Sequence, residues 1–177
     1  MSVDRLAPVA RLFGLLLGRE LDSSTEEALG DPTIAAALTE LGLALPEDLD
    51  RDELAAEFFE EFISPESGTP LVQSIAEGGT YEGDAAAGVR SIAEAAGLEW
   101  NRESLRGAPV DHLGTELFLW SELVARDESA AQIFADRHLR WAPAVLRRSP
   151  AERFYGRCRH VCADFIDLLL SEAPTAS

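Results

Sequence analysis

The sequence predicts an all-α fold, built as a single-domain bundle of about seven to nine helices. Apolar residues recur at intervals of three and four along most of the chain, which is the spacing of one face of an α-helix. Alanine and leucine dominate the apolar residues, whereas β-branched residues are scattered, so strand signals are weak. With 177 residues and no internal repeat or dividing linker, the chain is expected to form one domain over residues 1–177.

The first helices are indicated by apolar stripes and capping residues. Near the N-terminus, one stripe has helical spacing: Leu6, Val9, Phe13, Leu16 and Leu17. Asp31 and Pro32 combine an N-cap with a proline at the first helical position, and Gly42 is placed to end that helix. Asp50 and Glu53, three residues apart, resemble a capping box. The helix that they open carries three apolar residues on one face: Leu54, Phe58 and Phe62.

Residues 64–83 are expected to be irregular because prolines and glycines are dense there, although residues 71–77 fit a short helical turn. Residues 84–96 then predict a helix that Gly97 ends, and residues 110–125 predict the central helix. Asp127 is expected to cap the next helix.

The last helix is expected to follow residues 149–152, where a serine and a glutamate form a capping box with Pro150 at the first helical position. The tail from about residue 172 is expected to fray. Within the last helix, Cys158 and Cys162 share one face, whereas His160 is turned away by about 160–200°. This geometry favours buried core cysteines over a metal site.

The chain is strongly acidic, with 32 acidic residues against 15 basic ones, all arginine, and a formal net charge of −17. Nucleic-acid binding requires clustered basic residues, so this charge argues against such a partner. An excess of acidic residues usually serves solvation; the functional alternative is a surface that attracts a basic peptide.

The apolar segments are shorter than the roughly 18–20 residues that cross a bilayer, so no membrane insertion is expected. Residues 12–17 lack a small-residue cleavage site and are expected to belong to a helix of the mature protein. Two cysteines suit a reducing compartment and exclude a disulfide framework. We therefore expect a cytoplasmic protein.

Residues 107–117 form the most informative stretch, because they place an acid and an imidazole behind a proline at the start of the central helix. A second histidine–leucine step follows one helix later, at His138 and Leu139, with Trp141 nearby. No bond-breaking chemistry is evident in these pieces. They predict a recognition surface on a helical scaffold.

The order of these features resembles the TorD/DmsD/NarJ family of chaperones for molybdenum-cofactor oxidoreductases. The resemblance covers residues 54–169 and includes an aromatic-rich helix at 57–62 and an aromatic pair at 154–155. Val72 and Ala76 stand where the family often has aromatic residues, and Gly107 and Ala108 stand where it often has an acid before the proline. The residues that match its motifs, and that are expected to bind the client, are Pro70, Ser74, Pro109, Asp111, His112, Glu116, His138 and Trp141. Trp120 on the central helix is expected to bind the client as well.

The resemblance implies a dedicated, non-enzymatic chaperone that needs no cofactor for its task. Such a protein binds the twin-arginine leader and the apo catalytic subunit of a molybdopterin-dependent oxidoreductase and assists cofactor insertion before export or assembly. It would act as a monomer or a dimer.

A leader peptide has two adjacent arginines followed by an apolar stretch, so its recognition needs carboxylates and an apolar groove. We expect Asp111 and Glu116 to supply the carboxylates, and Leu117, Trp120 and the Pro70 loop to supply the groove. Asp111 fits equally well as a helix N-cap. For His112 and Glu116, four residues apart on one helical face, the alternative is a hydrogen-bonded or ionic surface pair.

Two other functions stay open at this stage. A helical adaptor with an unrelated protein partner would share the fold and the acidic surface, so only the identity of the partner separates it from a chaperone. A metal-dependent helical-bundle enzyme would use four potential ligands: Asp111, His112, Glu116 and His138. Metal analysis of the purified protein and of the His112→Ala variant distinguishes that reading.

Overall fold

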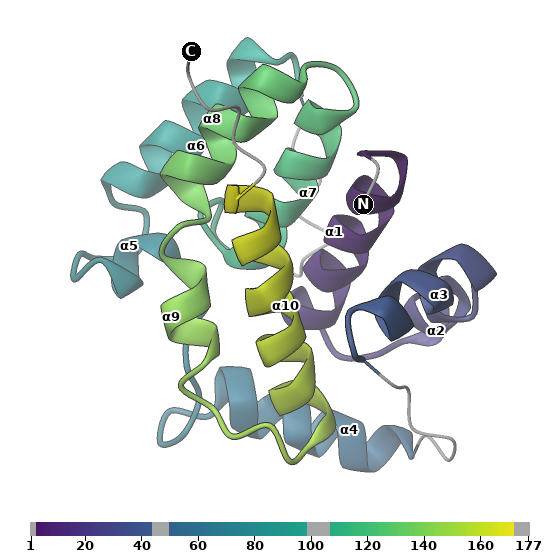
Figure 1. The fold of residues 1–177 in the computed structure, drawn as a ribbon. Helices are drawn as coiled ribbons and strands as arrows, with labels where there is room; N and C mark the ends of the chain where they lie inside the picture. Colours follow the sequence, from purple (N-terminus) through teal and green to yellow (C-terminus); the bar gives the residue numbers. More distant parts are fainter. Residues whose placement is uncertain (1–2, 44–49, 99–106, 172–177) are drawn as a thin grey trace.

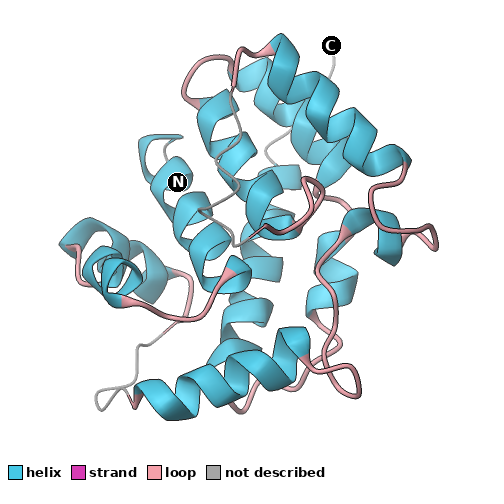
Figure 2. Cartoon of the chain, turned by 180° about the vertical axis from the view of Figure 1, so that it is seen from behind, coloured by secondary structure: helices cyan, strands magenta, loops and turns pink. Residues whose placement is uncertain are grey.

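The computed structural model describes residues 3–43, 50–98 and 107–171, and in these ranges the chain is all-α with no β-strand (Figure 2). The described part has ten α-helices, slightly more than the seven to nine expected, because short helices at 23–29, 73–76 and 142–146 lie between the longer ones. The bounds are α1 Val3–Gly18, α2 Ser23–Leu29, α3 Pro32–Glu40, α4 Arg51–Phe58, α5 Gln73–Ala76, α6 Asp84–Ala95, α7 Leu113–Val124, α8 Glu128–His138, α9 Ala142–Leu146 and α10 Phe154–Ser171. The predicted frayed tail lies outside the described residues.

A π-helical segment, η1 (Phe59–Ile63), continues α4 with a wider turn. Its backbone ring is closed by the Ser64 N–H, which donates to the Phe59 carbonyl oxygen at 2.7 Å. Such segments are uncommon and occur frequently at functional sites. The sequence pattern predicted only a regular helix here.

The core lies where α1, α7 and α10 meet. The predicted stripe of α1 is buried, since each of its five apolar residues is at most 2% exposed. Phe165 of α10 packs on Phe13 of α1, with ring centroids 5.6 Å apart, and on Trp120 of α7, at 6.4 Å. Cys158 and Cys162 are buried free thiols on the same helix, which confirms the prediction of core cysteines.

Figure 1 shows how the other helices surround this core. The α2–α3 pair lies to one side of α1, α4 crosses below the start of α10, and α6 and α8 lie at the opposite end of the bundle. Of the helices described, none is long and apolar enough to span a membrane.

Several predicted helix starts are confirmed. The carboxyl groups of Asp31, Asp50 and Asp127 accept backbone N–H groups of the helices that follow them. The capping box predicted at 149–152 is wrong, because α10 begins at Phe154. Instead, Glu57 of α4 caps this helix, accepting the Tyr155 N–H at 2.6 Å. A cap supplied from 98 residues away has no local sequence signal.

Candidate functional site

The proline-containing loop and the Asp111–His112 step, which are far apart in the sequence, are joined by backbone pairing. Val72 and His112 form an isolated antiparallel bridge, framed by two hydrogen bonds. The Gln73 N–H donates to the Asp111 carbonyl oxygen at 2.9 Å, and the Leu113 N–H donates to the Leu71 carbonyl oxygen at 2.8 Å. The two segments therefore form one unit at the start of α7.

Asp111 anchors this unit from the interior. Its side chain is fully buried, and Oδ2 accepts the Ser74 N–H at 3.0 Å. Asp111 thus supports the first turn of α5 and does not cap its own helix. The N-cap of α7 is His112, whose Nδ1 accepts the Gly114 N–H at 3.1 Å. The N-cap interpretation of Asp111 was therefore wrong by one residue.

His138 is held in the interior by Gln73. The Gln73 amide nitrogen donates to Glu77 Oε1 at 2.9 Å and to the Arg137 carbonyl oxygen at 3.3 Å. Its amide oxygen is therefore left to accept from His138 Nδ1, 2.9 Å away, which fixes the neutral ring with its proton on Nδ1. Burial, together with the charge of Arg137, lowers the pKa of His138 to about 4.

Glu116 is fully buried and accepts a hydrogen bond from Trp141 Nε1 at Oε2, at 3.2 Å. The same indole N–H also lies 2.8 Å from the His138 carbonyl oxygen. Burial raises the pKa of Glu116 well above its usual value, and the nearby Asp111 charge adds to the rise. Through the Trp141 indole, the buried Glu116 side chain therefore links α7 to the end of α8.

The raised pKa of Glu116 predicts a specific pH dependence of stability. Above pH 4.5 the unfolded chain releases this proton while the folded protein keeps it, so the site lowers the free energy of unfolding as the pH rises. Glu116→Gln removes that loss, so the stability of the variant relative to the wild type should increase between about pH 5 and pH 8. Urea unfolding of both proteins at the two pH values measures this difference.

The histidines act in the opposite direction, since a pKa lowered to about 4 makes His112 and His138 destabilise the fold as the pH falls below 6.5. This contribution is common to both proteins and cancels in the comparison. A stability difference that is constant with pH would contradict a buried neutral Glu116.

A pocket of about 260 Å³ opens beside His112. Its walls come from the end of α1, from α4 and η1, and from the segment before α7. The lining residues are Leu17, Gly18, Arg19, Glu20, Phe58, Phe62, Ile63, Gly107, Ala108 and His112. His112 is partly exposed there, and the dense protein around its ring lowers its pKa to about 4. The imidazole is therefore neutral at pH 7.

The position of the α1 wall depends on two glycines. A Cβ atom on Gly114 would lie 2.8 Å from the Gly14 carbonyl oxygen and 3.4 Å from the Gly18 Cα. A Cβ atom on Gly14 would lie 2.9 Å from the Gly114 carbonyl oxygen. Only glycine at both positions permits this close crossing of α1 and α7, which brings residues 17–20 to the first turn of α7.

The aromatic wall of the pocket belongs to a larger cluster. Phe58 and Phe62 pack on each other with ring centroids 4.9 Å apart, and both pack edge-on against Tyr155 of α10. Next to them on η1, Phe59 is 49% exposed and Ile63 is 53% exposed. Ile63 also lines the pocket, so an exposed apolar side chain borders it.

The predicted site residues differ in exposure, and only some of them lie at the pocket. His112 lines the pocket, and Pro109 beside it is partly exposed. Pro70 is exposed outside the pocket, and Trp141 is partly exposed while holding Glu116. The remaining five are at most 4% exposed and do not reach the surface: Ser74, Asp111, Glu116, Trp120 and His138. Asp111 and Glu116, from which we expected the carboxylates for a leader peptide, are therefore interior groups, and Leu117 and Trp120 lie in the core.

Sequence reasoning missed most of the pocket. Leu17, Phe58 and Phe62 were assigned to apolar helix stripes, and Glu20 had no motif at all. Phe58 and Phe62 carried a signal, since they lie in the aromatic-rich helix. In the described residues, no group of three or more histidine, cysteine, aspartate or glutamate side chains is placed to hold a metal ion.

A family model described as nitrate reductase delta subunit matches residues 27–147, which is more than half of the 177 residues. The match contains α4, η1, the proline loop and the Asp111–His112 step, and it ends before α10. Comparisons with curated proteins and with solved structures found no match.

Proposed function

The chain belongs to the nitrate reductase delta subunit family, a family of chaperones for molybdoenzyme maturation, and we propose that it binds the twin-arginine leader of a molybdoenzyme catalytic subunit in the pocket beside His112. The resemblance to the TorD/DmsD/NarJ family is thereby confirmed. We propose further that the bound subunit is retained until its cofactor has been inserted. The task is binding alone, without catalysis or a cofactor of the chaperone's own.

The single observation that carries this proposal is the composition of the pocket. Leu17, Phe58, Phe62 and Ile63 provide apolar walls. Glu20 adds a carboxyl group, and the charge of Arg19, which also lines the pocket, is paired with Asp22 at 3.4 Å. An apolar segment preceded by arginines matches both features, because arginine prefers carboxylate partners and the rest of the leader prefers burial. The net charge of −17 supports the encounter with a basic peptide.

His112 has a defined chemical part in this binding. Its Nδ1 accepts the Gly114 N–H, so the proton of the neutral ring is on Nε2. The remaining ring nitrogen is therefore a hydrogen-bond donor. Its natural partner in the client is a backbone carbonyl oxygen, and an arginine side chain, which has only donors, does not fit it. Glu20 is the better partner for arginine.

Fluorescence anisotropy of a labelled leader peptide, titrated with the protein at low and high salt, tests the proposal. The control peptide has both arginines replaced by glutamine. We expect binding at about micromolar Kd or tighter, weakened in the control peptide and at high salt. Glu20→Gln should weaken binding of the arginine peptide about tenfold and leave the control peptide unaffected, as expected for a lost charge-assisted hydrogen bond.

The matched control variant is Glu94→Gln, which removes the same charge from an exposed position on α6. It should leave the affinity within about twofold of wild type, because solvent screens distant surface charges. His112→Ala should weaken both peptides equally, since a backbone carbonyl is present in each. No binding to leader peptides of molybdoenzymes would instead favour an adaptor with another partner.

A further inference from the structure

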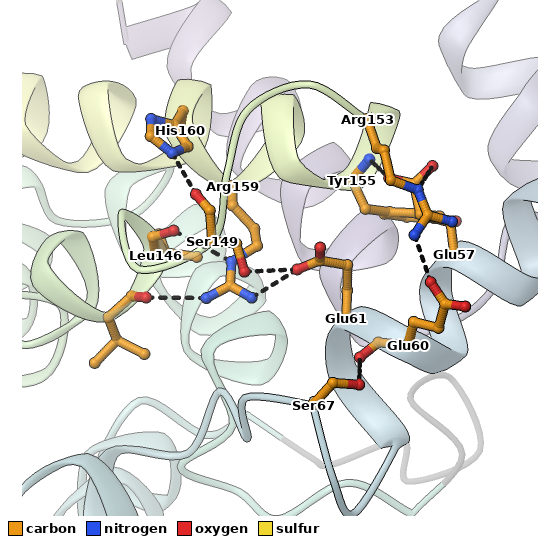
Figure 3. A network of polar contacts seen from close by, with 11 residues as sticks. Glu57, Glu60, Glu61, Ser67, Leu146, Ser149, Arg153, Tyr155, Arg159 and His160 are labelled. Carbon is orange, nitrogen blue, oxygen red and sulfur yellow. Dashed lines mark hydrogen bonds and ion pairs between the residues drawn. The ribbon is translucent and has the colours of Figure 1, made fainter.

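A buried arginine lies behind the aromatic wall of the pocket. Arg159 of α10 is fully buried, and three of its nitrogens have partners. Nε donates to the Leu146 carbonyl oxygen at 3.2 Å, Nη2 to the Val145 carbonyl oxygen at 2.9 Å, and Nη1 to Glu61 Oε2 at 3.0 Å (Figure 3). Burying a guanidinium is costly, and an apolar side chain of similar volume is often at least as stable. Stability alone therefore does not account for an arginine here.

Glu61, the partner of Arg159, is in the middle of η1 and is tied on two sides. Its Oε2 also accepts from Ser149 Oγ at 2.7 Å, and its carbonyl oxygen accepts the Thr69 N–H at 3.0 Å. The side chain thus connects η1 to α10 and to the segment after α9, as Figure 3 shows. The ion pair is therefore one of the contacts that hold η1 against α10.

Phe62, the residue after Glu61, links Arg159 to the pocket. The guanidinium carbon of Arg159 lies over its ring, 5.7 Å from the centroid, within the range of a cation–π contact. Phe62 lines the pocket, as does its neighbour Ile63. The same guanidinium therefore holds the backbone of η1 through Glu61 and the wall of the pocket through Phe62.

We propose that Arg159 is a positioning residue for client binding. Its ion pair with Glu61 keeps η1 in the conformation that places Phe62 and Ile63 along the pocket. Arg159 lies beyond the residues that match the family model, so α10 completes a site whose motif residues are elsewhere. The effect on client affinity rests on the proposed function, whereas the effect on η1 is independent of it.

The first test is hydrogen exchange in Arg159→Met, which needs no ligand. The Ser64 and Thr69 amides donate within η1 and to Glu61, so they report its position directly. The matched control is Ile166→Ala, a buried substitution on α10 outside the pocket. Arg159→Met should accelerate exchange at both amides at least about tenfold more than Ile166→Ala does at equal global stability. Equal acceleration in the two variants would overturn the proposal.

The second test is leader-peptide affinity under conditions where all variants are folded. Arg159→Met and Glu61→Gln should each weaken binding about fivefold, and the double variant should be no worse than the single ones, because they remove one interaction. Ile166→Ala should bind like wild type. Glu61→Gln keeps an acceptor for Ser149 and serves if Arg159→Met does not fold. Wild-type affinity in both single variants would overturn the role in binding, whereas a wild-type protein that binds no leader would refute only the proposed function.

The exposed pair between Arg153 and Glu60 provides an internal comparison. It also joins the start of α10 to η1, but Arg153 is 52% and Glu60 57% exposed. Arg153→Met should leave both exchange and affinity close to wild type, since exposed ion pairs contribute little. An effect as large as that of Arg159→Met would show that any link to η1 suffices, which contradicts a specific role of Arg159.

Discussion

Replacing Gly114 with alanine is expected to lower the free energy of unfolding by about 1–3 kcal/mol and to weaken leader binding, because the new methyl group forces α1 away from α7. The Cβ atom would meet the Gly14 carbonyl oxygen at 2.8 Å and His112 Nδ1 at 3.2 Å. Helix propensity favours alanine by up to about 1 kcal/mol, but a clash with backbone outweighs it. Urea unfolding and peptide anisotropy measure the two effects.

Gly30→Ala is the matched control, since it makes the same change at the end of α2. There the nearest atoms to a Cβ lie at 3.4 and 3.5 Å, and φ is −77°, which alanine adopts freely. This variant should be neutral or slightly stabilising. If Gly114→Ala were equally harmless, the close helix crossing would not determine the pocket.

Replacing Asp111 with alanine is expected to cost about 3 kcal/mol of stability, because the buried Ser74 N–H loses its acceptor and its desolvation is then uncompensated. Asp111→Asn keeps an oxygen at this position and should cost less. Urea unfolding measures the stability, and hydrogen exchange at the Ser74 amide shows whether the loss is at this bond.

Asp31→Ala is the comparison for this loss, since Asp31 also caps backbone N–H groups but is exposed. It should cost about 1 kcal/mol. A loss at Asp111 no greater than that at Asp31 would contradict an anchoring role. A folded Asp111→Ala protein should still bind the leader through His112 and Glu20. His112→Ala should bind weakly and lose about 1 kcal/mol, because it removes the N-cap of α7.

The motif residues show which features the sequence predicts and which it does not. The spacing of proline, aspartate and histidine identified the family, and the family model confirms it. The spacing did not show which motif residue faces a ligand. Asp111 and His112 are adjacent, yet one is fully buried against Ser74 and the other lines the pocket. Their directions depend on the backbone pairing with residues 71–73, which no local pattern predicts.

The start of α10 is a second feature that local sequence did not predict. Asp31, Asp50 and Asp127 were recognisable caps because a capping side chain and the N–H groups it accepts lie within three residues. The Tyr155 N–H is capped by Glu57, so the local signal at 149–152 was misleading. Only packing of α4 against α10 makes that long-range cap available.

The sequence by itself determined the helical class, the burial of α1 and α10, the caps at Asp31, Asp50 and Asp127, and the family. These follow from periodicity and from contacts within a few residues. The tertiary structure alone decided the site. The close crossing of α1 and α7 at Gly14 and Gly114 places Glu20 and His112 along one pocket, and the Arg159–Glu61 pair holds η1 and Phe62 beside it. A pocket forms between elements that are distant in the chain, so its lining depends on packing geometry that no short pattern encodes.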